Sequence, residues 1–298
     1  MKFADIVKTV KGNKPKTLAV AVAEDLDVLE AVVHAKAEGI ANPVLVGTKA
    51  DIEKIAKEAK LDLSGMEIID EPGHAAAVKK AVTLVGEGKA DVLMKGLVHT
   101  ADFLRGVLNK EWGLATGRTI SMVGIVDSPK YDRLIFITDP AIATYPDLPM
   151  KIDLINNAVT VTRALGVDKP KVACLCAVET VNPKMQATLD AAALAKMGDR
   201  GQFKNCIVDG PFALDNALSE GAAKHKGLVS PVAGLADILL CHNIETANSL
   251  YKSVTYLSDC ETAGMVLGAR VPLVITSRAD TSTVKFNSIA CALLATGK

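Results

Sequence analysis

Two polar segments carry residue types that suit the binding of an anionic group. Thr276-Ser-Arg-Ala-Asp280 and Lys95-Gly-Leu-Val-His-Thr-Ala-Asp102 each follow an apolar stretch of strand character. The guanidinium of an arginine matches phosphate oxygens with a planar fork of donors, and the free N–H groups at a helix start also hold anions. We therefore expect an anion site that includes Ser277 and Arg278 from the first segment and Lys95 and Thr100 from the second.

Two residues near the second segment have an open interpretation. His99 either reaches the bound anion or packs as a loop histidine. Arg105 lies in the helix that should follow, where it either contacts phosphate or stays solvated. Both are candidates for substrate binding.

Three further polar strings follow expected strands. They are Glu179-Thr-Val-Asn-Pro-Lys184, Asp209-Gly-Pro-Phe-Ala-Leu-Asp-Asn216 and Asn243-Ile-Glu-Thr-Ala-Asn248. Such turns are often helix caps or plain loops, so Asp215 either caps a helix or faces a cleft. Asp209, Asp215 and Asn248 are the substrate-binding candidates from this part of the chain.

Several common catalytic motifs are missing from the sequence. There is no G-x-G-x-x-G after the first expected strand, no Walker A loop, no H-E-x-x-H and no G-x-S-x-G. A Rossmann dinucleotide site, a P-loop nucleotidase, a zinc protease of that type and a hydrolase serine elbow are therefore not supported.

The elements that must position these residues alternate between strand and helix. This order is typical of mostly parallel α/β sheets, whose ligands bind beyond the carboxyl ends of the strands. The turn after Val126 predicts one antiparallel hairpin, and Asp139–Pro149 is the candidate boundary between two lobes. We expect strands at 17–23, 43–47, 67–70, 91–95, 120–126, 134–138, 172–178, 206–209, 238–241 and 271–276, and helices at 27–38, 51–59, 75–86, 101–109, 151–165, 184–197, 214–225 and 285–294.

The composition fits a globular α/β chain. Apolar residues make up 49% of the 298 residues, and 34 basic residues balance 34 acidic ones, so no basic surplus points to nucleic acid. No apolar run is long enough to span a bilayer, and the segment 1–16 lacks a signal-peptide pattern. Six cysteines without a C-x-x-C pair suit buried, reduced thiols. We expect a cytoplasmic protein with no membrane or nucleic-acid partner.

Five strings taken together resemble the phosphate acetyl/butyryltransferase family, and most of all its phosphate butyryltransferase branch. The similarity covers nearly the whole chain in order. The strings are Lys95-Gly-Leu-Val-His-Thr-Ala-Asp-Phe-Leu-Arg105, Ala177-Val-Glu-Thr-Val-Asn-Pro-Lys-Met185, Asp209-Gly-Pro-Phe-Ala-Leu-Asp-Asn-Ala217, Ser230-Pro-Val-Ala-Gly-Leu-Ala-Asp237 and Ser277-Arg-Ala-Asp280.

The resemblance implies a fold and a reaction. The fold would be two α/β/α domains of the isocitrate/isopropylmalate dehydrogenase type with an interdomain cleft, at 1–139 plus 265–298 and at 140–264. The reaction would interconvert a short acyl-CoA plus phosphate with acyl phosphate plus CoA. CoA would be a substrate, no cofactor or metal would be bound, and the chain would be a homo-oligomer, a dimer or higher.

The resemblance also implies catalytic roles for the serine-arginine turn. Arg278 would hold phosphate and the charge of the transition state, and Ser277 would donate a hydrogen bond near the thiol or carbonyl. The acetyltransferase branch has an aspartate six residues after this arginine, where the present chain has Val284. Asp280 is the nearest substitute as a base, although it could cap the last helix, and Lys285 could instead lower the pKa of the thiol.

Three other functions stay open on the sequence. One is a phosphate acetyltransferase, because the preferred acyl group is not readable. The second is a decarboxylating dehydrogenase with NAD and a divalent metal held by carboxylates such as Asp139, Asp209 and Asp215. The third is a relative that binds CoA or acyl phosphate without catalysis, which the loss of the aspartate at Val284 favours.

Overall fold

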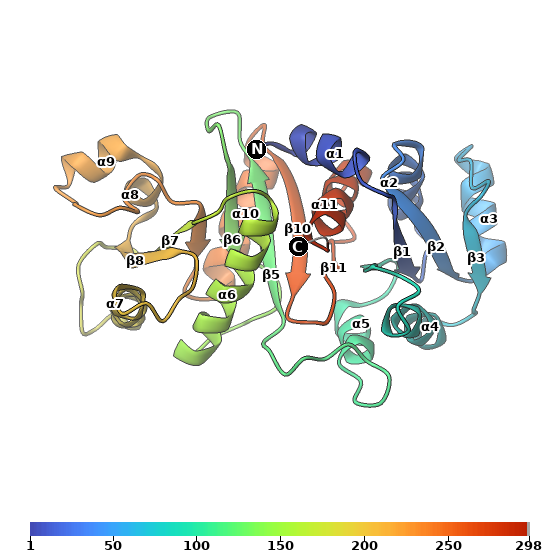
Figure 1. Cartoon of the computed structure of the whole chain (residues 1–298), viewed down its shortest axis with the longest axis horizontal. Coiled ribbons are helices and arrows are strands. Elements are labelled where there is room, and N and C mark those ends of the chain that lie inside the picture. Colours follow the sequence, from blue (N-terminus) through green and yellow to red (C-terminus); the bar gives the residue numbers. More distant parts are fainter. Residues whose placement is uncertain (297–298) are drawn as a thin grey trace. The chain divides into compact units, whose positions relative to one another are not determined.

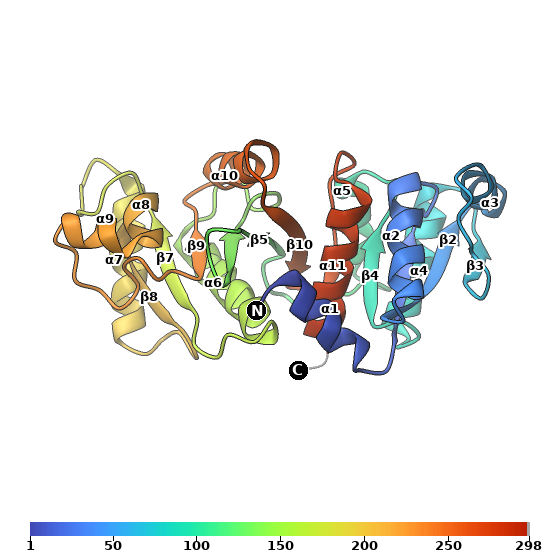
Figure 2. The ribbon, with the colours of Figure 1, turned by 90° about the horizontal axis from the view of Figure 1, so that it is seen from above.

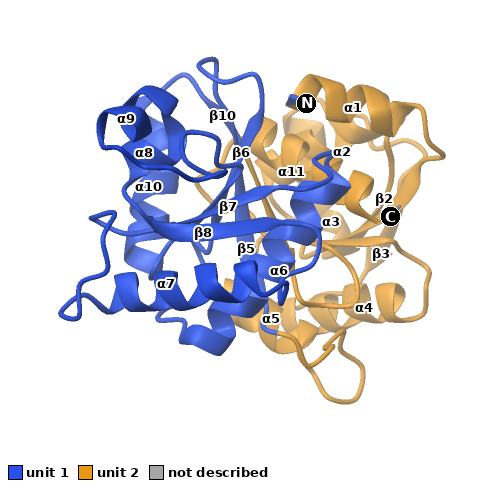
Figure 3. Cartoon of the chain, turned by 60° about the vertical axis from the view of Figure 1, so that its left-hand side comes forward, with its two compact units in different colours: residues 1–2, 119–262 blue, residues 3–118, 263–298 orange. Residues whose placement is uncertain are grey.

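The computed structural model describes residues 1–296 (Figure 1). The chain forms two compact units, coloured separately in Figure 3. The terminal unit contains Phe3–Arg118 and the segment from Ala263 onward, and the central unit contains Met1–Lys2 and Thr119–Thr262. The C-terminal segment therefore returns to the unit that holds the N-terminal half.

The terminal unit contains a mostly parallel sheet. Strand β1 lies between β2 and β4, β11 lies on the far side of β4, and these four run parallel. β3 is parallel to β2, and β10 pairs antiparallel with β11. The strands are β1 (Lys16–Ala21), β2 (Ala41–Gly47), β3 (Glu67–Asp70), β4 (Val92–Lys95), β10 (Glu261–Leu267) and β11 (Leu273–Val274), in the order β3-β2-β1-β4-β11-β10.

The helices of this unit cover both faces of its sheet (Figures 1 and 2). Helices α1, α2 and α11 pack together on one face, and α4 and α5 pack together on the other. The four strands β1, β4, β11 and β10 carry side chains that are almost all buried, as expected where helices cover both faces. The helices are α1 (Phe3–Lys11), α2 (Leu26–Ala37), α3 (Lys49–Glu58), α4 (His74–Gly86), α5 (Thr100–Val107) and α11 (Ser282–Ala295).

The order of the strands marks where a ligand should bind. The chain moves outward from β1 to β2 and β3, then returns across β1 to place β4 on its other side. This reversal is a topological switch point, and open α/β sheets bind ligands in the crevice that it leaves beyond the carboxyl ends of the strands. β11 is parallel to β4, so the Ser277-Arg278 turn reaches the same edge of the sheet as Lys95.

The central unit contains the other five strands of the large α/β sheet. β6, β9, β7 and β8 are parallel, and β5 pairs antiparallel with β6 as the predicted hairpin. The strands are β5 (Ser121–Asp127), β6 (Leu134–Thr138), β7 (Lys171–Leu175), β8 (Ile207–Phe212) and β9 (Ile238–Leu240), in the order β5-β6-β9-β7-β8, and the helices are α6 (Leu148–Ala164), α7 (Gln186–Asp199), α8 (Leu214–Leu218), α9 (Glu220–His225) and α10 (Ile244–Leu257).

Most predicted elements are present, and several differ from the prediction. The predicted helix 214–225 is broken at Ser219, whose hydroxyl accepts from the Ala222 N–H and starts a new helix. The predicted last strand keeps only Leu273–Val274, and β8 continues to Phe212, so Asp209 lies inside a strand instead of after it. Helices α1 and α10 and strand β10 were not predicted. No helix within residues 1–296 is both long and apolar enough to cross a membrane.

The expected domains, residues 1–139 with 265–298 and residues 140–264, stay a prediction. The compact units place β5 and β6 with the central unit, because β6 pairs with β9 through Phe136 and Ile238. The mixed α/β class with a large sheet agrees with the sequence-based prediction.

Candidate active site

The Ser277-Arg278 turn is held in shape by Asp280. The Asp280 carboxylate accepts from the Ser277 N–H at 2.8 Å, and the Asp280 N–H donates to the Ser277 carbonyl at 3.2 Å. Asp280 does not cap α11, because Thr281 is the N-cap and accepts from the Val284 N–H. The Lys285 ammonium donates to the Asp280 carbonyl. The carboxylate of Asp280 therefore fixes the turn and does not cap the last helix, and its predicted role as a base stays a prediction.

Arg278 and His99 meet across the edge of the sheet. Arg278 Nη2 lies 3.2 Å from His99 Nδ1, which brings the turn after β11 to the start of α5. A guanidinium only donates, so His99 Nδ1 must accept and Nε2 must carry the proton of the neutral ring. Both side chains are exposed, and no carboxylate within residues 1–296 pairs with Arg278. The guanidinium keeps most of its donors for a ligand.

The start of α5 offers further donors beside this pair. His99 is the N-cap residue, but its side chain makes no capping hydrogen bond. The first N–H groups of a helix have no partner within the helix, and the helix dipole places partial positive charge there. Thr100, the first residue of α5, is half-buried. The structure therefore brings Arg278 to His99, the residue before Thr100 at the start of α5.

Lys95 is a buried cation at the end of β4. It is 4% exposed, and its ammonium donates to the carbonyls of Gly96 at 3.1 Å and Val98 at 3.2 Å. No carboxylate among the described residues 1–296 lies within ion-pair distance of it. Burial, followed by the positive charge of Arg278, lowers the pKa of Lys95 to about 8. The positive charge of Arg278 therefore acts on the Lys95 ammonium.

The backbone around Lys95 is unusually close-packed. A Cβ added to Gly96 would lie 2.0 Å from the carbonyl oxygen of Val22, so only glycine fits there. Val22 follows β1 with a φ of 60°, a left-handed conformation that a β-branched residue rarely adopts. Strain of this kind costs about 1–3 kcal/mol and tends to occur at functional sites. Here it lies at the switch point between β1 and β4.

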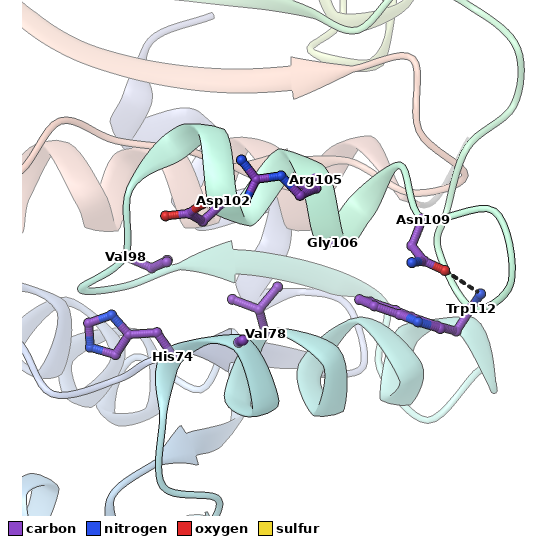
Figure 4. Close-up of a pocket in the computed structure, with 9 residues that line it drawn as sticks. His74, Val78, Val98, Asp102, Arg105, Gly106, Asn109 and Trp112 are labelled. Carbon is purple, nitrogen blue, oxygen red and sulfur yellow. Dashed lines mark hydrogen bonds and ion pairs between the residues drawn. The ribbon is translucent and has the colours of Figure 1, made fainter.

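Arg105 lies apart from the Arg278–His99 pair. Its Nη1 donates to Asp102 Oδ1 at 2.6 Å, and the side chain is largely exposed. Instead it borders a pocket between α4 and α5 that also involves His74, Val78 and Trp112 (Figure 4). This pocket was not predicted from the sequence, because its lining comes from two helices whose contact depends on the fold. A signal was the lone tryptophan in a chain with few aromatics.

Three predicted site residues belong to the central unit, and none contacts another. Asp209 accepts from the Ser230 hydroxyl and the Gly210 N–H. Asp215 pairs with Lys226 at 3.0 Å, and the hydrogen bond from Lys226 lowers its pKa. Asn248 donates to the Pro140 carbonyl at 2.8 Å. Asp215 lies in the first turn of α8 and is not its N-cap, which is Ala213.

Asp139, Asp209 and Asp215, the carboxylates that suggested a metal-dependent dehydrogenase, do not form a group that could hold a metal ion. Asp139 is buried and accepts N–H groups from Met122, Ala141, Ile142 and Ala143, and burial raises its pKa. Within residues 1–296, no group of three or more histidine, cysteine, aspartate or glutamate side chains is arranged to hold a metal ion.

Comparison with known proteins identifies the relatives of this chain. The phosphate acetyl/butaryl transferase family matches residues 2–79 and 71–293. A phosphate butyryltransferase of Clostridium acetobutylicum is 55% identical over 99% of this chain and 98% of its own length. A phosphate acetyltransferase of Thermotoga maritima is 46% identical over 96% of each chain.

A solved structure agrees with these relatives. A branched-chain phosphotransacylase from Enterococcus faecalis V583 is 30% identical, with a TM-score of 0.84 over 95% of this chain and 99% of that one. The resemblance read from the motifs is therefore confirmed, and the chain belongs to the phosphate acetyl/butaryl transferase family.

Proposed function

We propose that this enzyme is a phosphate butyryltransferase, which interconverts butyryl-CoA plus phosphate with butyryl phosphate plus CoA. One observation supports the location of the active site. The Arg278 guanidinium meets His99 at the uncapped start of α5, on the same sheet edge as the buried Lys95. A guanidinium and the free N–H groups of a helix start are groups that hold phosphate, which supports a phosphate site here.

The proposal also specifies which acyl group the enzyme transfers. The Clostridium relative with 55% identity is named a phosphate butyryltransferase, whereas the Thermotoga relative with 46% identity is named a phosphate acetyltransferase. One methylene changes selectivity by only about 1–3 kcal/mol, so acetyl transfer is the second candidate.

Arg278 holds the phosphate throughout the reaction. In the direction of thioester formation, the CoA sulfur bonds to the carbonyl carbon of butyryl phosphate and the bond from that carbon to the bridging oxygen breaks. The electron pair leaves with phosphate, and Arg278 together with the N–H groups at the start of α5 stabilises the added charge. Ser277 donates its hydroxyl to the carbonyl or to the thiol.

The thiol must lose a proton, and Lys95 is the acceptor in this proposal. A neutral lysine has two N–H bonds, which Gly96 and Val98 accept, and one lone pair that remains for the thiol proton. The pKa of Lys95, about 8, is close to that of a free thiol, about 8.5. Asp280 remains a catalytic candidate from the sequence, but its bond to the Ser277 N–H favours a positioning role.

The proposal also includes the other residues predicted to bind substrate. His99 Nε2–H donates to the phosphate and Thr100 binds a phosphoryl oxygen, while Asp209, Asp215 and Asn248 stay candidates for substrate binding. The finer fold description, two α/β/α domains of the isocitrate/isopropylmalate dehydrogenase type, also stays a proposal. So do the absence of a bound cofactor, cytoplasmic location and a homo-oligomeric state.

A substrate series tests the function. Purified protein is incubated with CoA and acetyl, propionyl, butyryl or isobutyryl phosphate, and thioester and phosphate are measured together. We expect thioester and phosphate to form in equal amounts, and the rate to be highest with butyryl phosphate. Fastest turnover of acetyl phosphate would move the assignment to the second candidate. No turnover of any of them would refute acyl transfer, and NAD reduction with a divalent metal and a 2-hydroxy acid would then be assayed.

A further inference from the structure

Lys285 is a buried lysine in the first turn of α11, where a cation is unfavourable for two reasons. It is 2% exposed, and the removal of an ammonium from water opposes folding. The start of a helix has partial positive charge, so a cation in the first turn is repelled by the helix dipole. Residues that break such rules are expected at functional sites. The position of Lys285 therefore needs a reason other than the stability of α11.

The Lys285 ammonium is bonded to the turn that presents Arg278. It donates to the carbonyl of Asp280, which comes two residues after Arg278 in the chain. The Asp280 carboxylate accepts from the Ser277 N–H at 2.8 Å, and the Asp280 N–H donates to the Ser277 carbonyl at 3.2 Å. Lys285 therefore holds the backbone of the residue whose side chain holds Ser277.

The carboxylate that faces Lys285 comes from α2, the helix that packs beside α11 (Figure 2). Asp27 Oδ2 lies 4.0 Å from the Lys285 ammonium, and the Asp27 side chain is 45% exposed. His34 of α2 stacks on Phe286 with 4.0 Å between the ring centres, which joins the two helices next to Lys285. Water screens a half-exposed carboxylate at this distance, so Asp27 neutralises the charge of Lys285 only in part.

The charge of Lys285 acts on Lys95 at the end of β4. Burial and then the charge of Arg278 lower the pKa of Lys95 to about 8, and Lys285 lowers it further, whereas Asp25 and Asp280 raise it. Asp25 is the N-cap of α2, Arg278 and Asp280 belong to the turn after β11, and Lys285 belongs to α11. A like charge disfavours the protonated form, so loss of the Lys285 charge should raise the pKa of Lys95.

We propose that Lys285 is a positioning residue for acyl transfer, whose ammonium holds the turn that presents Arg278 and adds a positive charge to the surroundings of Lys95. Lys285 does not touch substrate in this assignment. It acts through its hydrogen bond to the Asp280 carbonyl and through its charge. The inference rests on the proposed function, because Arg278 and Lys95 are the groups through which Lys285 acts on the reaction.

Replacement of Lys285 tests its bond to the turn. Lys285→Met keeps an unbranched apolar chain in the buried space but removes the donor. It should lower kcat for butyryl phosphate and CoA about tenfold or more, because a displaced turn misplaces Arg278. Lys285→Arg keeps a charged donor and should recover most of this loss. Lys16→Met is the matched control and should keep the wild-type kcat, since the Lys16 ammonium donates to the Leu293 carbonyl at 3.0 Å, near the other end of α11.

The titration of Lys95 tests the effect of the Lys285 charge without any turnover. In protein with isotope-labelled lysine side chains, the NMR resonance of Lys95 is identified by its absence from Lys95→Met, and its pH dependence gives the pKa. This pKa should be higher in Lys285→Met than in wild type, and unchanged in Lys285→Arg and Lys16→Met. The acid limb of kcat/KM should accordingly move to higher pH in Lys285→Met, because less of Lys95 is neutral at a given pH. A residue that only stabilised the fold would leave this titration unchanged.

A double variant shows whether Lys285 and Asp280 act through the same turn. Asp280→Ala and Lys285→Met together should lower kcat by little more than the larger of the two single changes, because either change alone releases the turn. Losses that multiply in the double variant would mean that Lys285 acts elsewhere, and would overturn the inference.

The outcomes separate this inference from the proposed function. A near-normal kcat of Lys285→Met, or an unchanged Lys95 titration in this variant, would overturn the inference. If Lys285→Met does not fold, Lys285→Gln, which keeps a donor without the charge, takes its place in the titration with the same expected shift. If wild-type protein does not convert acyl phosphate and CoA, the proposed function fails, and the titration still decides whether Lys285 acts on Lys95.

Discussion

Arg278 Nη2 lies 3.2 Å from His99 Nδ1, and this contact joins two strand-end segments that are 179 residues apart in the chain. The pair lies on the edge of the sheet where β4 and β11 both end. Because no carboxylate within residues 1–296 neutralises Arg278, its charge is available to a substrate.

Replacing Arg278 should therefore reduce transition-state stabilisation. Arg278→Ala should lower kcat about 10²–10³-fold, the range seen when one preorganised donor is removed. Arg278→Lys should recover little, because a lysine lacks the planar fork. Arg200→Ala, at an exposed position just after α7, is the control. The variants are compared by steady-state kinetics. A near-normal kcat of Arg278→Ala would contradict a catalytic role for Arg278.

The pH dependence of kcat/KM should report Lys95. Its pKa of about 8 means that the neutral form, which can accept the thiol proton, is lost as the pH falls below that value. We expect kcat/KM to decline tenfold per unit below about pH 7 in the wild type. Lys95→Met and Lys95→Arg should both lose most activity, and added methylamine should restore part of it only in Lys95→Met.

An electrostatic role for Lys95 predicts a different pattern. If the ammonium merely holds phosphate, Lys95→Arg keeps activity, and methylamine rescue depends on its charged form. That result, read from rates against pH and amine concentration, would reject the proton-acceptor role while leaving Lys95 in the site.

The same lysine should destabilise the folded protein. Folding lowers its pKa from 10.5 to about 8, so the folded state binds fewer protons than the unfolded state between these values, and stability rises with pH across that window. Below about pH 8 the full cost, about 3 kcal/mol, is present. Lys95→Met should raise the free energy of unfolding at pH 7 by an amount approaching this value, with a smaller gain at pH 10. Urea unfolding at both pH values measures it, and a destabilised Lys95→Met would contradict the burial cost.

Asp280 should matter through the turn that it holds. Asp280→Asn keeps an oxygen that can accept from the Ser277 N–H, so kcat should stay within about fivefold of wild type at every pH. Asp280→Ala removes the acceptor and should lower kcat by about tenfold or more. Loss of activity in Asp280→Asn, with an altered pH profile, would instead restore the carboxylate as the base.

Gly96 should be intolerant of any side chain. The Cβ of Gly96→Ala would meet the Val22 carbonyl at 2.0 Å, and a backbone atom cannot move aside as a side-chain end can. We expect a loss of about 3 kcal/mol or more in the free energy of unfolding, as for other steric overlaps in a core. Gly12→Ala, where the nearest atom is 3.4 Å away, should change it by less than about 1 kcal/mol. Equal unfolding midpoints for the two variants would contradict this account.

The sequence predicted the mixed α/β class and singled out the candidate anion-binding segments, because both inferences depend on local signals. Buried β-branched strands and polar residues after them are readable in Thr276–Asp280 and Lys95–Asp102. The Arg278–His99 contact was not predictable, since it depends on β11 pairing with β4. Residue Asp209 was misplaced because β8 continues through Gly210 and Pro211, which usually mark turns.

The proton acceptor could not be identified from sequence patterns. Asp280 was favoured by its distance from Arg278 along the chain, but its carboxylate is turned to the Ser277 N–H. The pKa of Lys95 is lowered by burial and by the charge of Arg278, and both depend on the folded chain.

The reaction of butyryl phosphate with CoA decides the account as a whole. Wild type and Arg278→Ala are mixed with both substrates, and butyryl-CoA and free phosphate are quantified from the same samples. The account predicts equimolar formation of the two products by wild type, without added metal or nucleotide, and a rate at least about 100-fold lower in Arg278→Ala. Absence of butyryl-CoA with wild type, or an equal rate in both proteins, would contradict it.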